Sequence, residues 1–139
     1  MDFPKVLLVS RCFIKRDDRI LLFHRTKERK YNPGKWELPG GKVEAGQDIN
    51  SATEREILEE TGLLVKIASP RTFTEAKMID HGKYKGMLYL EFVNEAVIIS
   101  GEVRLSGDHS EYKWIGLKEA LDFDLSLEAR KAITFFLGS

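Results

Sequence analysis

The chain has 139 residues, of which 42% are hydrophobic and 32% are charged. This balance is typical of one soluble globular domain and argues against a disordered protein, so we expect a single domain over residues 1–139. Lys and Arg together number 22, as do Asp and Glu, and the formal net charge of 0 makes a nucleic-acid partner or an anionic membrane surface a poor expectation.

Cysteine usage and hydropathy indicate the cellular compartment in which the protein is expected. Cys12 is the only cysteine and lies within an apolar run, so an intrachain disulfide is excluded and a buried, inert thiol is expected. No apolar stretch reaches the length of a membrane span, and the N-terminus lacks a signal-peptide pattern. We therefore expect a cytoplasmic protein without membrane contact, either a monomer or a homodimer.

Strand patterns dominate the first part of the chain. Residues 5–15 (KVLLVSRCFIK) and 19–26 (RILLFHRT) are apolar and rich in β-branched side chains, and the acidic turn between them predicts a hairpin. A polar segment with a Pro-Gly breaker, residues 27–35, predicts a loop that leads into the short apolar stretch 36–38. A glycine-rich segment follows and is expected to continue as a loop.

The best-marked helix begins after Asp48, which has the side chain of an N-cap, and extends to about Thr61. Gly62 stands where a left-handed C-cap is expected. Downstream, residues 63–78 and 84–93 predict two antiparallel strands around a turn at 80–83. Shorter strands are predicted at 97–99 and 112–115.

A last amphipathic helix is expected from about residue 125 to 137, with a packing role. Its apolar positions at near-helical spacing are Leu127, Ala132, Ile133, Phe136 and Leu137. Together these patterns predict an α+β fold with a mixed sheet.

Three glutamates stand out on the helix after Asp48. Relative to Glu56, Glu59 lies at roughly −60° and Glu60 at roughly +40°, so the three carboxylates share an arc of about 100°. Like charges at this spacing destabilise a helix. Two interpretations account for them: a solvated acidic face paired with lysines, or oxygen ligands of a hard divalent cation such as Mg²⁺.

The segment GKVEAGQDINSATEREILEETGL, residues 41–63, resembles the Nudix box, whose pattern is G-x5-E-x7-R-E-U-x-E-E-x-G-U with U an aliphatic residue. The flanking stretches WELPGGKVEAG (36–46) and EYKWIGLKEAL (111–121) also resemble the family, so the resemblance covers nearly the whole chain. It implies an α/β/α sandwich with a mixed central sheet that hydrolyses a nucleoside diphosphate linked to another group, with Mg²⁺ or Mn²⁺ as cofactor.

The resemblance also implies roles for individual residues. Glu56, Glu59 and Glu60 match the metal-binding glutamates of the family, and Glu56 is also the candidate for orienting or deprotonating water. Arg55 matches the arginine that steadies the glutamates through a charge-assisted hydrogen bond. The alternative for Arg55 is an ordinary surface residue.

One position departs from the family pattern. Gln47 stands where the box has Glu; it keeps an amide oxygen that can accept a hydrogen bond from Arg55 or coordinate weakly, but it lacks the negative charge. Glu44, three residues earlier, is a substitute carboxylate if the loop folds suitably. The departure motivates an alternative function, a module that binds a nucleotide with little or no turnover.

Other candidates lie outside the helix. Arg25, at a strand end, is expected to contact substrate phosphate, and the flexible backbone at Gly40 and Gly41 to approach the metal or ligand closely. Trp36 is a candidate for stacking on the base, with core packing as the alternative.

A second carboxylate that activates water is expected from a late loop. Glu111 is preferred, with Asp108 and Glu102 as alternatives. His24, His81 and His109 lack metal-ligand spacing and are expected in surface or core roles.

The stretch GKWELPGGKVE, residues 34–44, is most similar to family members that cleave nucleoside triphosphates, canonical or oxidised, to the monophosphate and pyrophosphate. The small-molecule substrate is therefore expected to be a nucleotide. A proline that marks members acting on ADP-ribose, some sixteen residues beyond the box, is absent.

Overall fold

A computed structural model describes residues 3–26, 33–105 and 109–138. The elements in chain order are β1 (Val6–Arg16), β2 (Arg19–Arg25), β3 (Trp36–Glu37), β4 (Gly40–Lys42), α1 (Ile49–Thr61), β5 (Leu64–Met78), β6 (Leu88–Ser100), β7 (His109–Gly116), the 3-10 helix η1 (Glu119–Asp122) and α2 (Leu127–Leu137). None of the helices in these ranges is both long and apolar enough to cross a bilayer.

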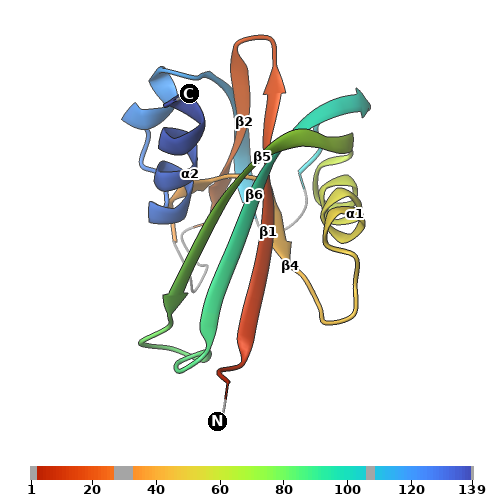
Figure 1. Cartoon of the computed structure of the whole chain (residues 1–139). Helices are drawn as coiled ribbons and strands as arrows, with labels where there is room; N and C mark the ends of the chain where they lie inside the picture. The colour runs from red at the N-terminus through yellow and green to blue at the C-terminus, as the bar shows by residue number, and fades with distance from the viewer. Residues whose placement is uncertain (1–2, 27–32, 106–108, 139) are drawn as a thin grey trace.

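The strands form a mixed sheet, as the sequence predicted. The order along the sheet is β3-β2-β1-β6-β5, with β4 paired to β1 and β7 paired to β2. β1 runs parallel to β6 from Val6 to Ile14, whereas the other pairings are antiparallel. β1 is therefore the central strand, flanked along much of its length by β6 (Figure 1).

Several strand predictions need correction. The hairpin of β1 and β2 exists, but the two strands pair only beside their turn, at Lys15 to Ile20 and Arg16 to Arg19. The separate strand predicted at 97–99 is wrong, because β6 continues unbroken from Leu88 to Ser100. At its polar centre the buried Asn94 accepts a hydrogen bond from Thr72 on β5, beside a shift in the β5–β6 register between Ile67 and Thr72.

The glycine-rich segment is also more regular than predicted. Gly40–Lys42 forms strand β4, which pairs with residues 9–11 of β1. Gly40 has φ of 136°, and a Cβ there would lie 2.3 Å from the carbonyl oxygen of Ser10. Only glycine permits this close approach of the two backbones.

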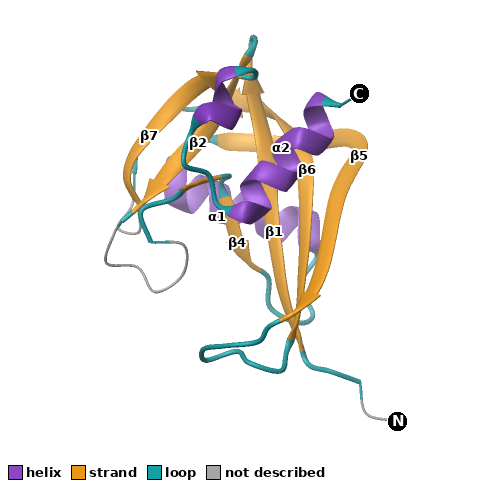
Figure 2. Ribbon diagram, turned by 90° about the vertical axis from the view of Figure 1, so that its left-hand side faces the viewer, coloured by secondary structure: helices purple, strands orange, loops and turns teal. Residues whose placement is uncertain are grey.

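The two helices cover opposite faces of the sheet, which gives the expected α/β/α layers (Figures 1 and 2). α1 ends as predicted: Asp48 accepts a hydrogen bond from the backbone N–H of Ser51, and Gly62 is left-handed with φ of 80°. α2 begins after Ser126, which caps the N–H of Ala129. Leu127, predicted on the packing face, is 56% exposed instead.

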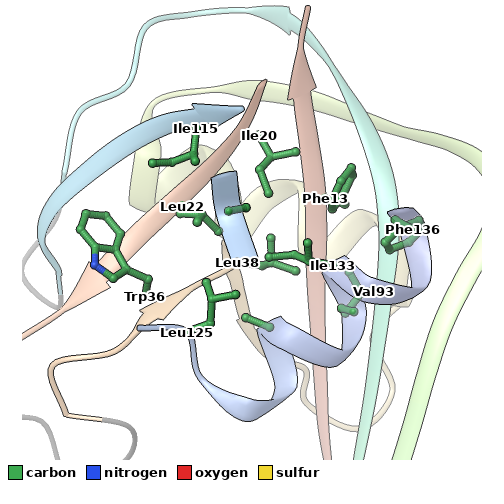
Figure 3. Packing of buried hydrophobic residues seen from close by; sticks show 13 residues of the cluster. Phe13, Ile20, Leu22, Trp36, Leu38, Val93, Ile115, Leu125, Ile133 and Phe136 are labelled. Atoms are coloured by element: carbon green, nitrogen blue, oxygen red, sulfur yellow. The ribbon is translucent and has the colours of Figure 1, made fainter. Parts of the chain in front are cut away.

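Each face of the sheet has its own apolar core. On the α2 side, Phe13, Leu22 and Val93 from the sheet pack against Ile133 and Phe136 (Figure 3). The core on the α1 side consists of Cys12, Ile14, Leu21, Phe23, Ile57, Leu63, Val65 and Ala96. Burial raises the pKa of the Cys12 thiol to about 12, which fits the inert thiol expected from the sequence.

Ile133 provides a test of the α2 packing. It is fully buried, so Ile133→Ala should lower the free energy of unfolding by about 2–5 kcal/mol through lost burial and the cavity that remains. The exposed Leu127 on the same helix is the matched control. Leu127→Ala should change the free energy of unfolding by about 0.5 kcal/mol or less. Urea unfolding measures both, and equal losses would contradict this packing.

Candidate active site

The inner face of α1 is held against β1 by one buried polar contact and one apolar one. Thr53 donates a hydrogen bond to the Ser10 hydroxyl on β1 at 2.6 Å, and both side chains are buried. Ile57, one turn further along, is fully buried in the core. Glu56 and Glu60 each lie three residues beyond one of these anchors, so the helix carries both carboxylates along the margin of its buried face.

Glu56 and Glu60 are joined by a hydrogen bond between their carboxyl groups. Burial, together with this hydrogen bond and the charge of Glu56, raises the pKa of Glu60 to about 8. The Oε2 atom of Glu60 is buried and has no hydrogen-bond partner among the described residues. Two carboxyl groups thus share a proton at neutral pH and leave one acceptor oxygen unused.

Glycine at position 41 lets Glu56 lie against β4. A Cβ on Gly41 would be 3.2 Å from Oε1 of Glu56, so a larger residue would press on the carboxylate. Gly40, next to it, is needed for the approach of β4 to β1. Both glycines therefore act on the site through packing, and a direct role for either in substrate binding stays a prediction.

Glu59 and Arg55 form a separate and more exposed pair on α1. The side chain of Glu59 is 63% exposed, and its Oε1 lies 3.8 Å from Nε of Arg55, a solvent-exposed ion pair. Glu59 also borders a cavity of about 300 Å³ together with Glu60 and Arg104. Within the described ranges no three acidic, histidine or cysteine side chains are grouped as a metal site, so the structure brings together two of the three predicted ligands.

Gln47 closes the loop that precedes α1. The side-chain oxygen of Gln47 accepts a hydrogen bond from the backbone N–H of Glu44 at 3.0 Å. The backbone N–H of Gln47 donates in turn to the backbone carbonyl of Glu44 at 3.3 Å. The Gln47 oxygen thus bonds to the backbone of Glu44, whereas the sequence suggests Arg55 as its partner. The side chain of Glu44 is exposed.

A buried charged cluster near the glutamate pair was not predicted. Glu37 on β3 is only 3% exposed, and its Oε1 accepts hydrogen bonds from Arg25 at 3.2 Å and from His109 at 2.8 Å. Its Oε2 lies 3.9 Å from Arg11. Burial opposes ionisation, but Arg11, His109 and Arg25 outweigh it and lower the pKa of Glu37 to about 2.

This cluster adjoins the pair on α1, because the charges of Arg11 and Glu37 both act on the pKa of Glu60. One pattern could have revealed Glu37: it is an acidic residue between Trp36 and Leu38 in a strand. Strand alternation places Glu37 on the opposite face from those two core residues. The sequence predicts a surface or core role for His109, and spacing alone does not reveal Glu37 as its partner.

Glu111 on β7 and Trp36 on β3 both pair in register with His24 of β2, the neighbour of Arg25 along that strand. Glu111 pairs in register with His24, whose Nδ1 lies 3.9 Å from its carboxylate, while Arg25 faces Glu37. Trp36 is 8% exposed, with its ring 4.9 Å from that of His24 and 5.4 Å from that of Phe123. These contacts favour core packing for Trp36 and separate Glu111 from the residues around Glu37.

The two remaining candidates for a late carboxylate are placed differently. Glu102 is exposed near the C-terminal end of α1, where its carbonyl oxygen would lie 3.0 Å from a Cβ on Gly62. Asp108 lies outside the described residues.

Comparison with known proteins agrees with the motif and the fold. Residues 6–136 match the model of the NUDIX domain. The chain belongs to the NUDIX domain family. Nucleoside triphosphatase NudI of Escherichia coli strain SE11 is 30% identical over 125 residues, which cover 86% of this chain and 89% of NudI. The chain is a Nudix hydrolase, and its relatives are named as nucleoside triphosphatases and pyrophosphatases.

Solved structures share this Nudix fold. A MutT protein from Methanosarcina mazei Go1 superposes with a TM-score of 0.81 at 23% identity, covering 99% of this chain and 97% of that one. A bifunctional NMN adenylyltransferase/ADP ribose pyrophosphatase from Francisella tularensis, complexed with AMP and a Mn ion, has a TM-score of 0.77 at 22% identity. That match covers 99% of this chain and 43% of the larger protein.

The Glu56 and Glu60 pair fits a divalent cation of the kind that Nudix hydrolases use. Mg²⁺ takes one or two carboxylates and keeps several waters. A cation here would replace the shared proton and give the buried Oε2 of Glu60 a partner. Glu59, on the exposed side of the helix, stays a predicted ligand.

The raised pKa of Glu60 predicts how the stability of the metal-free protein depends on pH. Glu60 has an ordinary pKa of 4.5 unfolded and about 8 folded, so between these values the folded state binds the extra proton. The free energy of unfolding should therefore decrease as the pH rises through this window. Glu60→Gln should remove this contribution and raise the melting temperature near pH 8.

Thermal unfolding in a chelating buffer, from about pH 5 to about pH 8.5, measures the difference between variant and wild type. The exposed Glu59 provides the control, because Glu59→Gln should leave the pH dependence unchanged. The same pH dependence in Glu60→Gln as in the wild type would contradict the shared proton.

Proposed function

We propose that this Nudix hydrolase cleaves a nucleoside triphosphate, canonical or oxidised, to the monophosphate and pyrophosphate with Mg²⁺ or Mn²⁺. The observation that carries the proposal is the Glu56 and Glu60 pair, two box glutamates held together on α1 with an unused buried oxygen. Similarity to NudI, a nucleoside triphosphatase, supports the substrate class. The Francisella relative, crystallised with AMP and Mn, supports the cofactor class.

Glu56 and Glu60 supply the anionic oxygens that hold the cation. When bound, the divalent ion neutralises phosphate charge and lowers the pKa of a coordinated water. Glu56 is the proposed acceptor of the water proton, because it belongs to the pair and is only partly buried. Arg25, which reaches the surface beside Glu37, is the proposed contact of the phosphate chain.

Removal of the Glu56 carboxylate tests the assignment. Glu56→Gln keeps the shape of the side chain, and because it loses the proton acceptor and one anionic ligand, kcat for triphosphate hydrolysis should fall about 100-fold or more. The release of pyrophosphate from a panel of nucleoside triphosphates measures this, with Mg²⁺, with Mn²⁺ and with a chelator.

The exposed Glu119 on η1 is the matched control, and Glu119→Gln should leave the rates unchanged. Hydrolysis that persists in the chelator, or that falls less than about threefold in Glu56→Gln, would refute the proposed role.

Gln47 motivates a second candidate function, nucleotide binding with little or no turnover. Glutamate can accept the same hydrogen bond from the Glu44 N–H, so Gln47→Glu should fold alike and add one negative charge near α1. If the wild type is a hydrolase, the Mg²⁺ concentration for half-maximal rate should fall about fivefold, equivalent to about 1 kcal/mol.

Activity against Mg²⁺ concentration measures this change, and the melting temperature with nucleotide added reports binding independently. Turnover that exists only in Gln47→Glu, with nucleotide stabilising both proteins, would favour the binding module. An unchanged Mg²⁺ requirement would show that the charge at position 47 has no effect on the cation.

A further inference from the structure

The charged cluster around Glu37 joins four strands at one buried carboxylate. Arg11 lies on β1, Arg25 on β2, Glu37 on β3 and His109 on β7. The side chains of Glu37 and His109 are 3% and 7% exposed, whereas that of Arg25 is 17% exposed. Arg25 is therefore the outer member of the Glu37, Arg25 and His109 group, and the other two lie behind it.

A β-bulge brings His109 into this group. In the β2–β7 ladder, His24 pairs with Glu111 but Arg25 pairs with His109, so β7 carries one extra residue at position 110. Regular alternation would place His109 on the same face as Glu111. The bulge turns it instead toward Phe23, 4.9 Å between ring centroids, and toward Glu37.

Burial of these groups is not explained by stability alone. A buried ion pair rarely stabilises a fold more than apolar side chains of the same volume would. Here two guanidinium groups and an imidazole surround Glu37 next to the glutamate pair on α1, and Arg11 also lies 3.8 Å from the buried Glu91. An arginine recognises phosphate through a planar fork whose orientation matters, and a hydrogen bond to a buried acceptor restricts that orientation.

We propose that Glu37, supported by His109, is a positioning residue that orients Arg25 toward the phosphate chain of the substrate. The inference rests on the proposed function and deepens it, because it places the phosphates along the β2–β3 edge beside Glu56 and Glu60. Glu37 does not touch the substrate; it acts through Arg25.

Substitution of Glu37 by glutamine keeps an acceptor oxygen but removes the charge that holds Arg25. For Glu37→Gln, the Kd for a non-hydrolysable nucleoside triphosphate with Mg²⁺ should rise about tenfold, and KM should rise with it, while kcat stays within about threefold. Isothermal calorimetry measures the Kd without any need for turnover. Failure of the wild type to hydrolyse triphosphates would therefore refute the proposed function and leave this test intact.

A double-variant cycle separates positioning from a merely structural role. If Glu37 acts through Arg25, then Glu37→Gln should weaken binding in the wild type but have little further effect in Arg25→Gln. Glu95, which lies 3.8 Å from Arg71 on the other side of the sheet from α1, is the matched control, and Glu95→Gln should leave Kd and KM unchanged.

Two results would overturn the proposal. One is an unchanged Kd in Glu37→Gln. The other is additive losses in the double variant, which would mean that Glu37 affects binding independently of Arg25.

Discussion

The close packing of α1 on β1 and β4 determines where the charged groups of the site lie. The Thr53 to Ser10 hydrogen bond and the buried Ile57 fix the helix against β1. Gly40 allows β4 to pair with β1, and a Cβ on Gly41 would press on Glu56. These contacts bring Glu56 and Glu60 together, and a cation that bound between them would take the place of the proton that they share.

Two ionisable clusters with opposite behaviour lie side by side as a result. Burial and the neighbouring carboxyl group raise the pKa of Glu60, whereas the surrounding cations lower the pKa of Glu37. Such paired perturbations are concentrated at functional sites. They suit a substrate that presents both a divalent cation and phosphate oxygens, because the Glu60 cluster favours positive charge and the Arg25 edge favours negative charge.

The fold was largely predictable because its determinants are local. Asp48 and Gly62 delimit α1 by cap chemistry, and apolar periodicity shows the strands. The Glu37 cluster was not predictable, since its members come from four strands and the bulge at residue 110 changes the face on which His109 lies. Glu111, which sequence position favours as the late carboxylate, pairs in register with His24, and its catalytic role stays a prediction.

Gln47 shows how a departure from the family motif can leave the geometry of a site intact. Its oxygen bonds to the backbone of Glu44 and so helps to shape the loop before α1, a task for which glutamine and glutamate are equally suited. The contacts that hold Glu56 and Glu60, from Thr53, Ile57 and Gly41, do not involve it. We therefore expect the residue at position 47 to affect the affinity of the proposed cation more than the positions of Glu56 and Glu60.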